Sequence, residues 1–199
     1  MGQYYRPVVG DVSGKDITVY GRSVDGKYVG GAKLMEHSWI GNPCMECVAK
    51  LLYKNPQRLA WIGDYAKQSD FEGVFKAGRH IEDSVAVPDV EKVWEIETPP
   101  GFKSDERIDF LDHKYFVNHE QKKYLDIDEY RDRSALEGDD CIHPISLLTA
   151  IGNGRGGGDF FNRIQMKFVG IWSWNLVSVE DEPLQGFEKD DKIAFSKYW

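Results

Sequence analysis

The chain has 199 residues, with 25 lysines and arginines against 33 aspartates and glutamates and a formal net charge of −8. A chain of this length can bury a core without disulfides or metals, and 41% hydrophobic and 13% aromatic residues argue against a disordered protein. The acidic balance argues against a protein that wraps long nucleic acid, because contacts with phosphates need lysine and arginine.

Two further observations bear on the cellular compartment of the protein. No apolar run approaches the roughly 20 residues of a membrane-spanning helix, and the first residues lack the apolar stretch of a signal peptide. The three cysteines are an odd number and too few for a disulfide scaffold. We therefore expect a cytoplasmic protein that has no contact with a membrane.

In the first half of the chain, residues 3–9 and 16–20 predict two strands that form a hairpin. The clearest helix follows, because Asn42 is a good N-cap, Pro43 suits the first helical position, and the pair at 55–56 ends the pattern. Residues 59–62 are wholly apolar and predict a buried strand. The apolar stripe of the helix consists of Cys44, Cys47, Val48, Leu51 and Leu52.

The second half of the chain mixes short strands with short helices. Strands outnumber helices and do not alternate with them, which favours an α+β fold with a mainly antiparallel sheet and a few short helices. We expect one compact domain over residues 1–199. In order, the patterns predict a short helix at 87–96, a break at 98–104, a hairpin of 115–117 and 124–127, a charged helix at 128–136, a helix from Pro144 to Ile151, and one or two strands within 166–179.

The most unusual local sequence is a glycine-rich loop that begins at Gly152. Backbone N–H groups without side chains can form a concave nest for an anion, and Arg155 could add a bidentate contact to a phosphate or carboxylate. The loop matches G-x-G-x-x-G, but a predicted helix precedes it and no helix start follows, so it is not a dinucleotide fingerprint. The alternative is a flexible connector. The residues that we predict to bind a ligand are Gly152, Asn153, Gly154, Arg155, Gly156, Gly157, Gly158 and Asp159.

The charge is unevenly distributed along the chain. Residues 141–178, which contain the loop, carry three basic residues and one acidic residue. Residues 103–140 carry seven basic and twelve acidic residues, and residues 179–199 carry three and six. Because charges are screened beyond about 10 Å at ordinary salt, the local balance decides what binds. The loop can therefore attract one small anion, while the acidic stretches are either a solvated surface or a face for a basic partner.

Two tryptophans follow the loop. In a strand, Trp172 and Trp174 would face the same side and could stack on a nucleotide base above the loop. The alternative is that both indoles pack in the core.

The spacing of the cysteines is compatible with a zinc site. Cys44 and Cys47 form a C-x-x-C at the helix start, and Cys141 with His143 could complete four ligands. The alternative is that Cys44 and Cys47 are core residues of the helix, because free cysteine is among the most buried residue types. We expect no metal and no cofactor, and these four residues are the candidate ligands if a metal binds.

The candidate catalytic residues are His37, Asp64, His143 and Asp159. A glutamate beside His37 could tune a base, and Asp64 follows a buried strand, where catalytic carboxylates often lie. Each has a structural alternative, as a hydrogen-bonded histidine beneath the sheet or as a turn residue. The other histidines, which we predict to lie at the surface, are His80, His113 and His119.

Four motifs are familiar together: MGQYY at 1–5, KLMEHSW at 33–39, WIGDYA at 61–66, and the run from His143–Pro144 through LLTA to the loop at 152–159. They resemble an uncharacterised family of proteins from bacteriophages and their bacterial hosts, and the resemblance covers most of the chain. It implies no catalytic residue and no cofactor. It does imply a context, because small phage proteins often counter host defences by binding an effector protein or by sequestering or degrading a nucleotide signal.

Three hypotheses of function follow. The first is a phage-type accessory protein that binds a small anionic, nucleotide-like ligand through the loop and so antagonises a host defence system. The second is an inhibitor, similar to anti-CRISPR proteins, that offers its acidic surface to a host defence protein. The third is a hydrolase of a phosphoester or glycosidic bond, which requires the candidate catalytic side chains to meet at one point.

Overall fold

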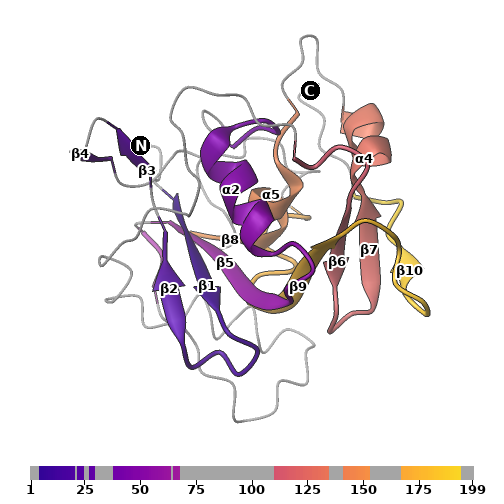
Figure 1. Ribbon diagram of the computed structural model, residues 1–199, viewed down its shortest axis with the longest axis horizontal. Helices are drawn as coiled ribbons and strands as arrows, with labels where there is room; N and C mark the ends of the chain where they lie inside the picture. The colour runs from indigo at the N-terminus through magenta and orange to yellow at the C-terminus, as the bar shows by residue number, and fades with distance from the viewer. Residues whose placement is uncertain are drawn as a thin grey trace.

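A computed structural model of the chain describes residues 5–20, 22–24, 27–29, 38–63, 65–67, 110–134, 141–152 and 167–193. Within these residues, a mainly antiparallel sheet of eight strands is accompanied by three short helices (Figure 1). The α+β fold expected from the sequence is confirmed. The helix expected at 87–96 and the break expected near 98–104 lie outside the described residues.

The strands of the main sheet are β1 (Tyr5–Gly10), β2 (Ile17–Val19), β5 (Gln57–Gly63), β6 (Tyr115–Asn118), β7 (Lys123–Asp126), β8 (Ala150–Ile151), β9 (Asn175–Glu180) and β10 (Glu188–Lys189). They run in the order β10–β7–β6–β9–β5–β1–β2, and β8 pairs with β5 as well. Two further strands, β3 (Arg22–Val24) and β4 (Lys27–Val29), form a separate hairpin. The pairs β5–β8 and β7–β10 are parallel, and the other pairs are antiparallel.

The central strand β5 has three partners. Strand β1 occupies one edge of β5 along residues 58–63. Strand β9 pairs with residues 57–59 of β5, and β8 pairs with residues 61–62. Because a strand has only two edges, β9 and β8 share the edge that β1 leaves open.

The first two strands form the predicted hairpin, and Asp11 builds its turn. The Asp11 carboxylate accepts hydrogen bonds from the backbone N–H groups of Lys15 and Asp16, at 2.9 and 3.2 Å, and from the Ser13 hydroxyl, at 2.7 Å. These bonds favour the ionised form, so they hold the pKa of Asp11 below its usual value. Gly14 adopts a φ of 70°, which a residue with a side chain rarely does.

The predicted helix is α2 (Pro43–Leu51), and it begins directly after Asn42. Cys47, Val48 and Leu52 of the predicted stripe are buried, whereas Leu51 is half-buried. Helix α2 contacts a second helix, α5 (Pro144–Thr149), which in turn contacts β5. Both helices cover the same face of the sheet (Figure 1). The predicted charged helix is α4 (Ile127–Ser134), at the end of β7.

The helix expected from Pro144 to Ile151 is shorter than predicted. It ends at Thr149, and the chain is extended at Ala150, with φ −68° and ψ 131°. Residues 150–151 then form β8 beside β5. The prediction failed because a run of apolar residues fits a buried helix and a buried strand equally well.

The strand expected within 166–179 is also shorter, because only β9 is a strand and residues 167–174 are turns. The reason is hydrogen bonding to another segment of the chain. The N–H groups of Gly170 and Trp172 and the hydroxyl of Ser173 donate to the last three carbonyls of α5, at 2.7 to 3.0 Å. Those carbonyls have no partner inside a helix, so the turns satisfy groups that would otherwise be buried unpaired.

The sheet is buried on both faces near its centre. Val9 and Leu59 are in register and belong to the core beneath the helices. Their neighbours Val8 and Ala60 point to the opposite face and are equally buried. The alternation of strand residues therefore separates two apolar layers rather than one layer and a wet surface.

A buried polar network fixes one end of the sheet. Arg58 donates to Glu120 Oε1 at 2.7 Å and to the backbone carbonyls of Trp174 and Val12 at 3.0 Å each. Asn175 donates to Glu120 Oε2 at 2.6 Å. These bonds satisfy a guanidinium that is almost fully buried, so the residues serve the fold and are not a free binding surface.

Candidate functional site

The glycine-rich loop leaves the sheet at the end of a parallel strand pair. Ile62 of β5 is in register with Ile151 of β8, so Gly63 and Gly152 lie together where both strands end. We call this border of the sheet its carboxyl edge. In open sheets with parallel strands, ligands bind outside the carboxyl ends of those strands. Gly152, the first residue of the loop, is buried at this edge. The rest of the loop, residues 153–159, and the candidate Asp64 lie outside the described residues.

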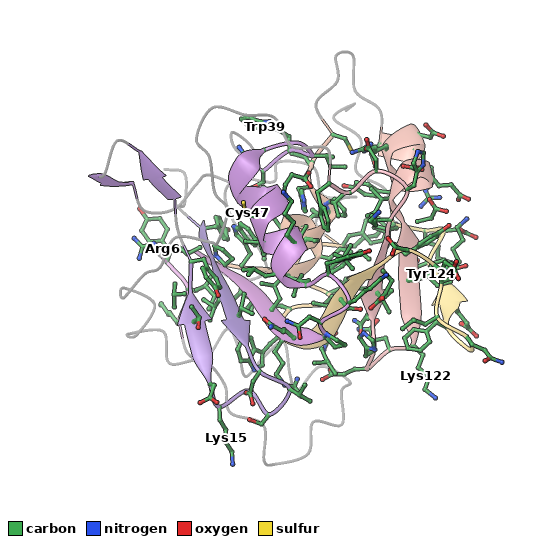
Figure 2. All side chains as sticks on the ribbon, in the orientation of Figure 1. Arg6, Lys15, Trp39, Cys47, Lys122 and Tyr124 are labelled. Carbon is green, nitrogen blue, oxygen red and sulfur yellow. The ribbon has the colours of Figure 1, made fainter. Side chains whose placement is uncertain are left out.

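Strand β1 brings a basic residue to the same edge. Arg6 is opposite Ile62, and the register places Arg6, Ile62 and Ile151 on one face of the sheet. Figure 2 shows Arg6 at the end of the β1–β2 hairpin that lies away from Lys15. We did not identify Arg6 from the sequence, because its neighbours in the sheet lie far along the chain and no local motif marks it.

The two tryptophans do not form a stacking platform. Trp172 and Trp174 are both 0% exposed. The Trp172 ring packs on Phe116 with centroids 5.2 Å apart, and the Trp174 ring lies against Gly10. The two residues are in turns and not in the strand that the stacking hypothesis required. We therefore remove both indoles from the candidate ligand site and assign them to the interior.

Among the candidate catalytic residues, His143 lies in the part of the chain that the structure describes. It belongs to a buried polar cluster with Ser38 and Glu46. The His143 backbone N–H donates to the Ser38 carbonyl at 2.7 Å, and its Nδ1 accepts from the Ile145 N–H at 3.3 Å, which caps α5. Because Nδ1 is an acceptor, the proton of the neutral ring is on Nε2. Nε2 and the Ser38 hydroxyl have no hydrogen-bond partner within the described residues.

The charge state of His143 follows from its burial. Its Nε2 lies 3.8 Å from Glu46 Oε1, which is within ion-pair range but beyond a hydrogen bond. Burial, with a smaller contribution from Arg131, lowers the pKa of His143 to about 3. Desolvation outweighs the nearby carboxylate, so His143 is neutral at pH 7 and the pair is not a salt bridge. The sequence did not predict this cluster, because nothing in it marks Ser38 or Glu46 as buried.

The two described cysteine side chains lie in the interior of the protein. Cys47 and Cys141 are free and buried, and burial raises the pKa of both thiols, that of Cys141 to about 12. A metal would bind these thiols as thiolates, so it would have to displace a proton from each of them against the raised pKa. Among the described residues, no three histidines, cysteines, aspartates or glutamates lie close enough to hold a metal. The side chain of Cys44 lies outside the described residues.

A histidine–serine–glutamate contact occurs where none was predicted. His119 is half-buried rather than at the surface, and its Nε2 lies 2.8 Å from the Ser178 hydroxyl. That hydroxyl donates to Glu180 Oε1 at 2.6 Å. The direction of these bonds argues against a nucleophile, because the serine proton goes to the carboxylate and Nε2 must donate to the oxygen. Ser178 is also 0% exposed, so no substrate can reach it in this structure.

Ion pairs neutralise part of the predicted acidic face. Within the described parts of 103–140 and 179–199, the pairs with lysine or arginine are Asp112–Arg131, Glu129–Arg133, Glu129–Lys189, Glu120–Arg58, Asp190–Lys123, Asp191–Lys189, Asp181–Lys54 and Asp181–Lys114. Carboxylates that are paired at close range contribute little to the field felt by a distant basic partner.

The remaining catalytic candidates, His37 and Asp159, lie outside the described residues, as Asp64 does. Whether they meet His143 at one point stays a prediction. None of the helices in the described part of the chain is both long enough and apolar enough to span a membrane. Comparisons of the chain with protein families, with curated proteins and with solved structures gave no match.

Proposed function

We propose that this chain binds a small anionic, nucleotide-like ligand through the loop at residues 152–159. The observation that carries the proposal is the parallel pairing of β8 with β5, which starts the loop at the carboxyl edge of two strands. Ligands approach sheets with parallel strands from that edge. The glycine N–H groups would bind the phosphate oxygens, and Arg155 would add a bidentate contact.

Charge supports a single small anion rather than a polymer. The stretch 141–178 has two more basic than acidic residues, although the whole chain carries −8. Arg6 reaches the same edge from β1. Since both indoles are buried, the nucleotide base would be recognised by groups other than Trp172 and Trp174.

The resemblance to phage accessory proteins suggests the consequence of binding. Sequestering a nucleotide signal would antagonise a host defence system without any catalytic step. The buried free thiols Cys47 and Cys141 suit the reducing cytoplasm, where such a signal would be found. Inhibition of a defence protein through an acidic surface is less well supported, because the ion pairs described above neutralise part of that surface.

The proposal is tested by thermal unfolding with nucleoside mono-, di- and triphosphates and cyclic dinucleotides. A ligand that binds only the folded state at 100 times its Kd stabilises it by about 2.7 kcal/mol, which raises Tm by about 5–10 °C in a domain of this size. Arg155→Ala is expected to reduce the shift. Lys15→Ala, which removes the same charge at the far end of the β1–β2 hairpin, is expected to keep it. If no nucleotide raises Tm, or if both variants respond alike, the proposal is wrong.

A further inference from the structure

A group of basic residues surrounds two aromatic rings near the C-terminal end of α2. Tyr53 follows the end of α2 and Phe110 precedes β6, and their rings meet edge to face with centroids 5.5 Å apart and planes at 89°. The Nζ atom of Lys50 lies 5.7 Å from the Phe110 centroid, and that of Lys54 lies 5.0 Å from the Tyr53 centroid. The Nζ atom of Lys114 lies within 6.0 Å of both.

These residues come together only in the fold. Lys50 is in the last turn of α2, Lys54 is in the following turn, and Lys114 comes just before β6. The Lys54 N–H donates to the Val179 carbonyl at 2.9 Å, and Val179 of β9 is paired with Phe116 of β6. These pairings hold the turn after α2 beside the strand that follows Lys114. An ammonium group near an aromatic ring gains a modest attraction, which holds the lysines in place without neutralising them.

One carboxylate lies between two of the three ammonium groups, those of Lys54 and Lys114. Asp181 Oδ2 accepts from the Tyr53 hydroxyl at 2.6 Å and pairs with Lys54 at 2.7 Å, and Oδ1 pairs with Lys114 at 3.1 Å. The hydrogen bonds from Lys54, Tyr53 and Lys114 hold the pKa of the Asp181 carboxyl well below its usual range. Asp181 is therefore ionised at any pH at which the protein would function.

The charges of the group do not balance. Three lysines and one aspartate leave two positive charges on a chain whose total is −8. Solvent reaches the group, since the side chains of Lys54 and Asp181 are 57% and 39% exposed and Lys50 is exposed. Like charges at this spacing repel each other, and the distant acidic residues are screened. A ligand with two negative charges would balance the group.

We propose that Lys50, Lys54 and Lys114 form a binding site for the phosphate group of a phosphate monoester, and that Asp181 is a built-in anion that competes with it. The monoester has the required charge, because its second pKa is about 6 and it is a dianion at pH 7.5. The rings of Tyr53 and Phe110 already contact the ammonium groups, so they shape the site and leave the phosphate as the recognised part. The site shares no residue with the glycine-rich loop, so it does not depend on the function proposed above.

Two substitutions at one segment separate this proposal from a purely structural ion-pair network. Asp181→Asn removes the competing anion and keeps a carbonyl oxygen that can accept from Tyr53. Glu182→Gln removes the same charge at the next residue, which is exposed. If Asp181 competes with a phosphate, Asp181→Asn tightens phosphate binding by about three- to tenfold, whereas Glu182→Gln changes it far less. Lys54→Gln with Lys114→Gln is expected to weaken binding by about tenfold or more, since removing even one hydrogen bond to a charged group has an effect of this order.

Binding is measured by amide chemical shifts during titration with inorganic phosphate, glycerol phosphate and AMP at pH 7.5 and low salt. The expected shifts fall on residues 50–54, 110–114 and 180–182, and they weaken on titration at pH 5. AMP binding no better than glycerol phosphate would identify the phosphate as the recognised part. The proposal is overturned if no probe shifts these residues, or if Asp181→Asn and Glu182→Gln change phosphate binding equally. It is also overturned if AMP binds and the other two probes do not. Arg155→Ala is expected to leave these shifts unchanged, so failure at either site is visible separately.

Discussion

The indole of Trp174 lies against the backbone of Gly10, so closely that a Cβ on Gly10 would be 2.6 Å from its Cη2 atom. Gly10 is the last residue of β1, and Trp174 has a φ of 57° and donates its N–H to the Leu59 carbonyl at 2.6 Å. The contact joins the first strand of the sheet to the turn that precedes β9. The indole cannot move away easily, because it is fully buried.

We therefore expect Gly10→Ala to lower the free energy of unfolding by about 1–3 kcal/mol, as overpacking a core does. Urea denaturation measures this loss. In a double-mutant cycle, Trp174→Phe is expected to reduce the effect of the alanine, because the smaller ring leaves room for the methyl group. Strictly additive losses would show that the two residues do not interact.

Two glycines with positive φ allow the cost of backbone strain to be measured separately from the cost of a steric clash. At Gly186, with φ 80°, a Cβ would meet nothing within 4 Å, so Gly186→Ala is expected to cost about 1 kcal/mol from conformation alone. At Gly170, with φ 69°, a Cβ would lie 2.3 Å from the Ala150 carbonyl oxygen, so Gly170→Ala is expected to cost about 2–4 kcal/mol. Equal losses of Tm for the two variants would contradict the close approach of Gly170 to β8.

Stability is expected to fall as the pH falls below about 6.5. The pKa of His143 is about 3 in the folded chain against 6.5 as its ordinary value, so the unfolded state binds a proton that the folded state does not. Each pH unit below 6.5 then costs about 1.4 kcal/mol until the pH approaches 3. The groups that face His143 are Glu46 from α2 and Arg131 from α4.

The variant that isolates this effect is His143→Asn, because asparagine keeps an acceptor for the cap of α5 and does not titrate in this range. Its unfolding free energy is expected to depend less on pH between 6.5 and 4. His113→Asn removes a histidine that is 88% exposed and is expected to keep the wild-type slope. The same slope in all three proteins would place the titrating group elsewhere.

The buried thiols are expected to be unreactive in the folded protein. In a Cys44→Ser variant, Cys47 and Cys141 should react with a disulfide reagent at pH 8 only as fast as the chain unfolds, because burial raises the pKa of both. Addition of urea should bring both to the rate of a free thiol. Rapid labelling of the native variant would show that one of them is accessible.

Local patterns predicted the elements that local chemistry determines. Asn42 and Pro43 marked the start of α2, and the turn residues between apolar runs marked both hairpins. The apolar run at 59–62 was correctly predicted to be a buried strand. In each case the deciding interactions lie within a few residues of the chain.

The failures concern interactions between distant segments. Ala150 leaves the helical conformation because an edge of β5 is open beside it, and Trp172 lies in a turn rather than a strand because the α5 carbonyls need donors. His119 was predicted to be at the surface, since its polar neighbours conceal a contact with Ser178 in another strand. The lysines around Tyr53 and Phe110 were missed for the same reason. Of the candidate site, the loop stays a prediction from the sequence, and the register of β5 with β8 shows where its first residue, Gly152, lies.

The shared edge of β5 also determines the order in which the sheet can be completed. Strand β1 precedes β5, so one edge is paired as soon as β5 is made, but the other edge waits for residues 150–151 and 175–177. Until then, the apolar run at 59–62 forms the open border of an incomplete sheet. Such a border can pair with another chain, and the pairings that close it are slow because they span long loops. We therefore expect aggregation during synthesis, rather than instability of the finished protein, to limit the yield of folded chain.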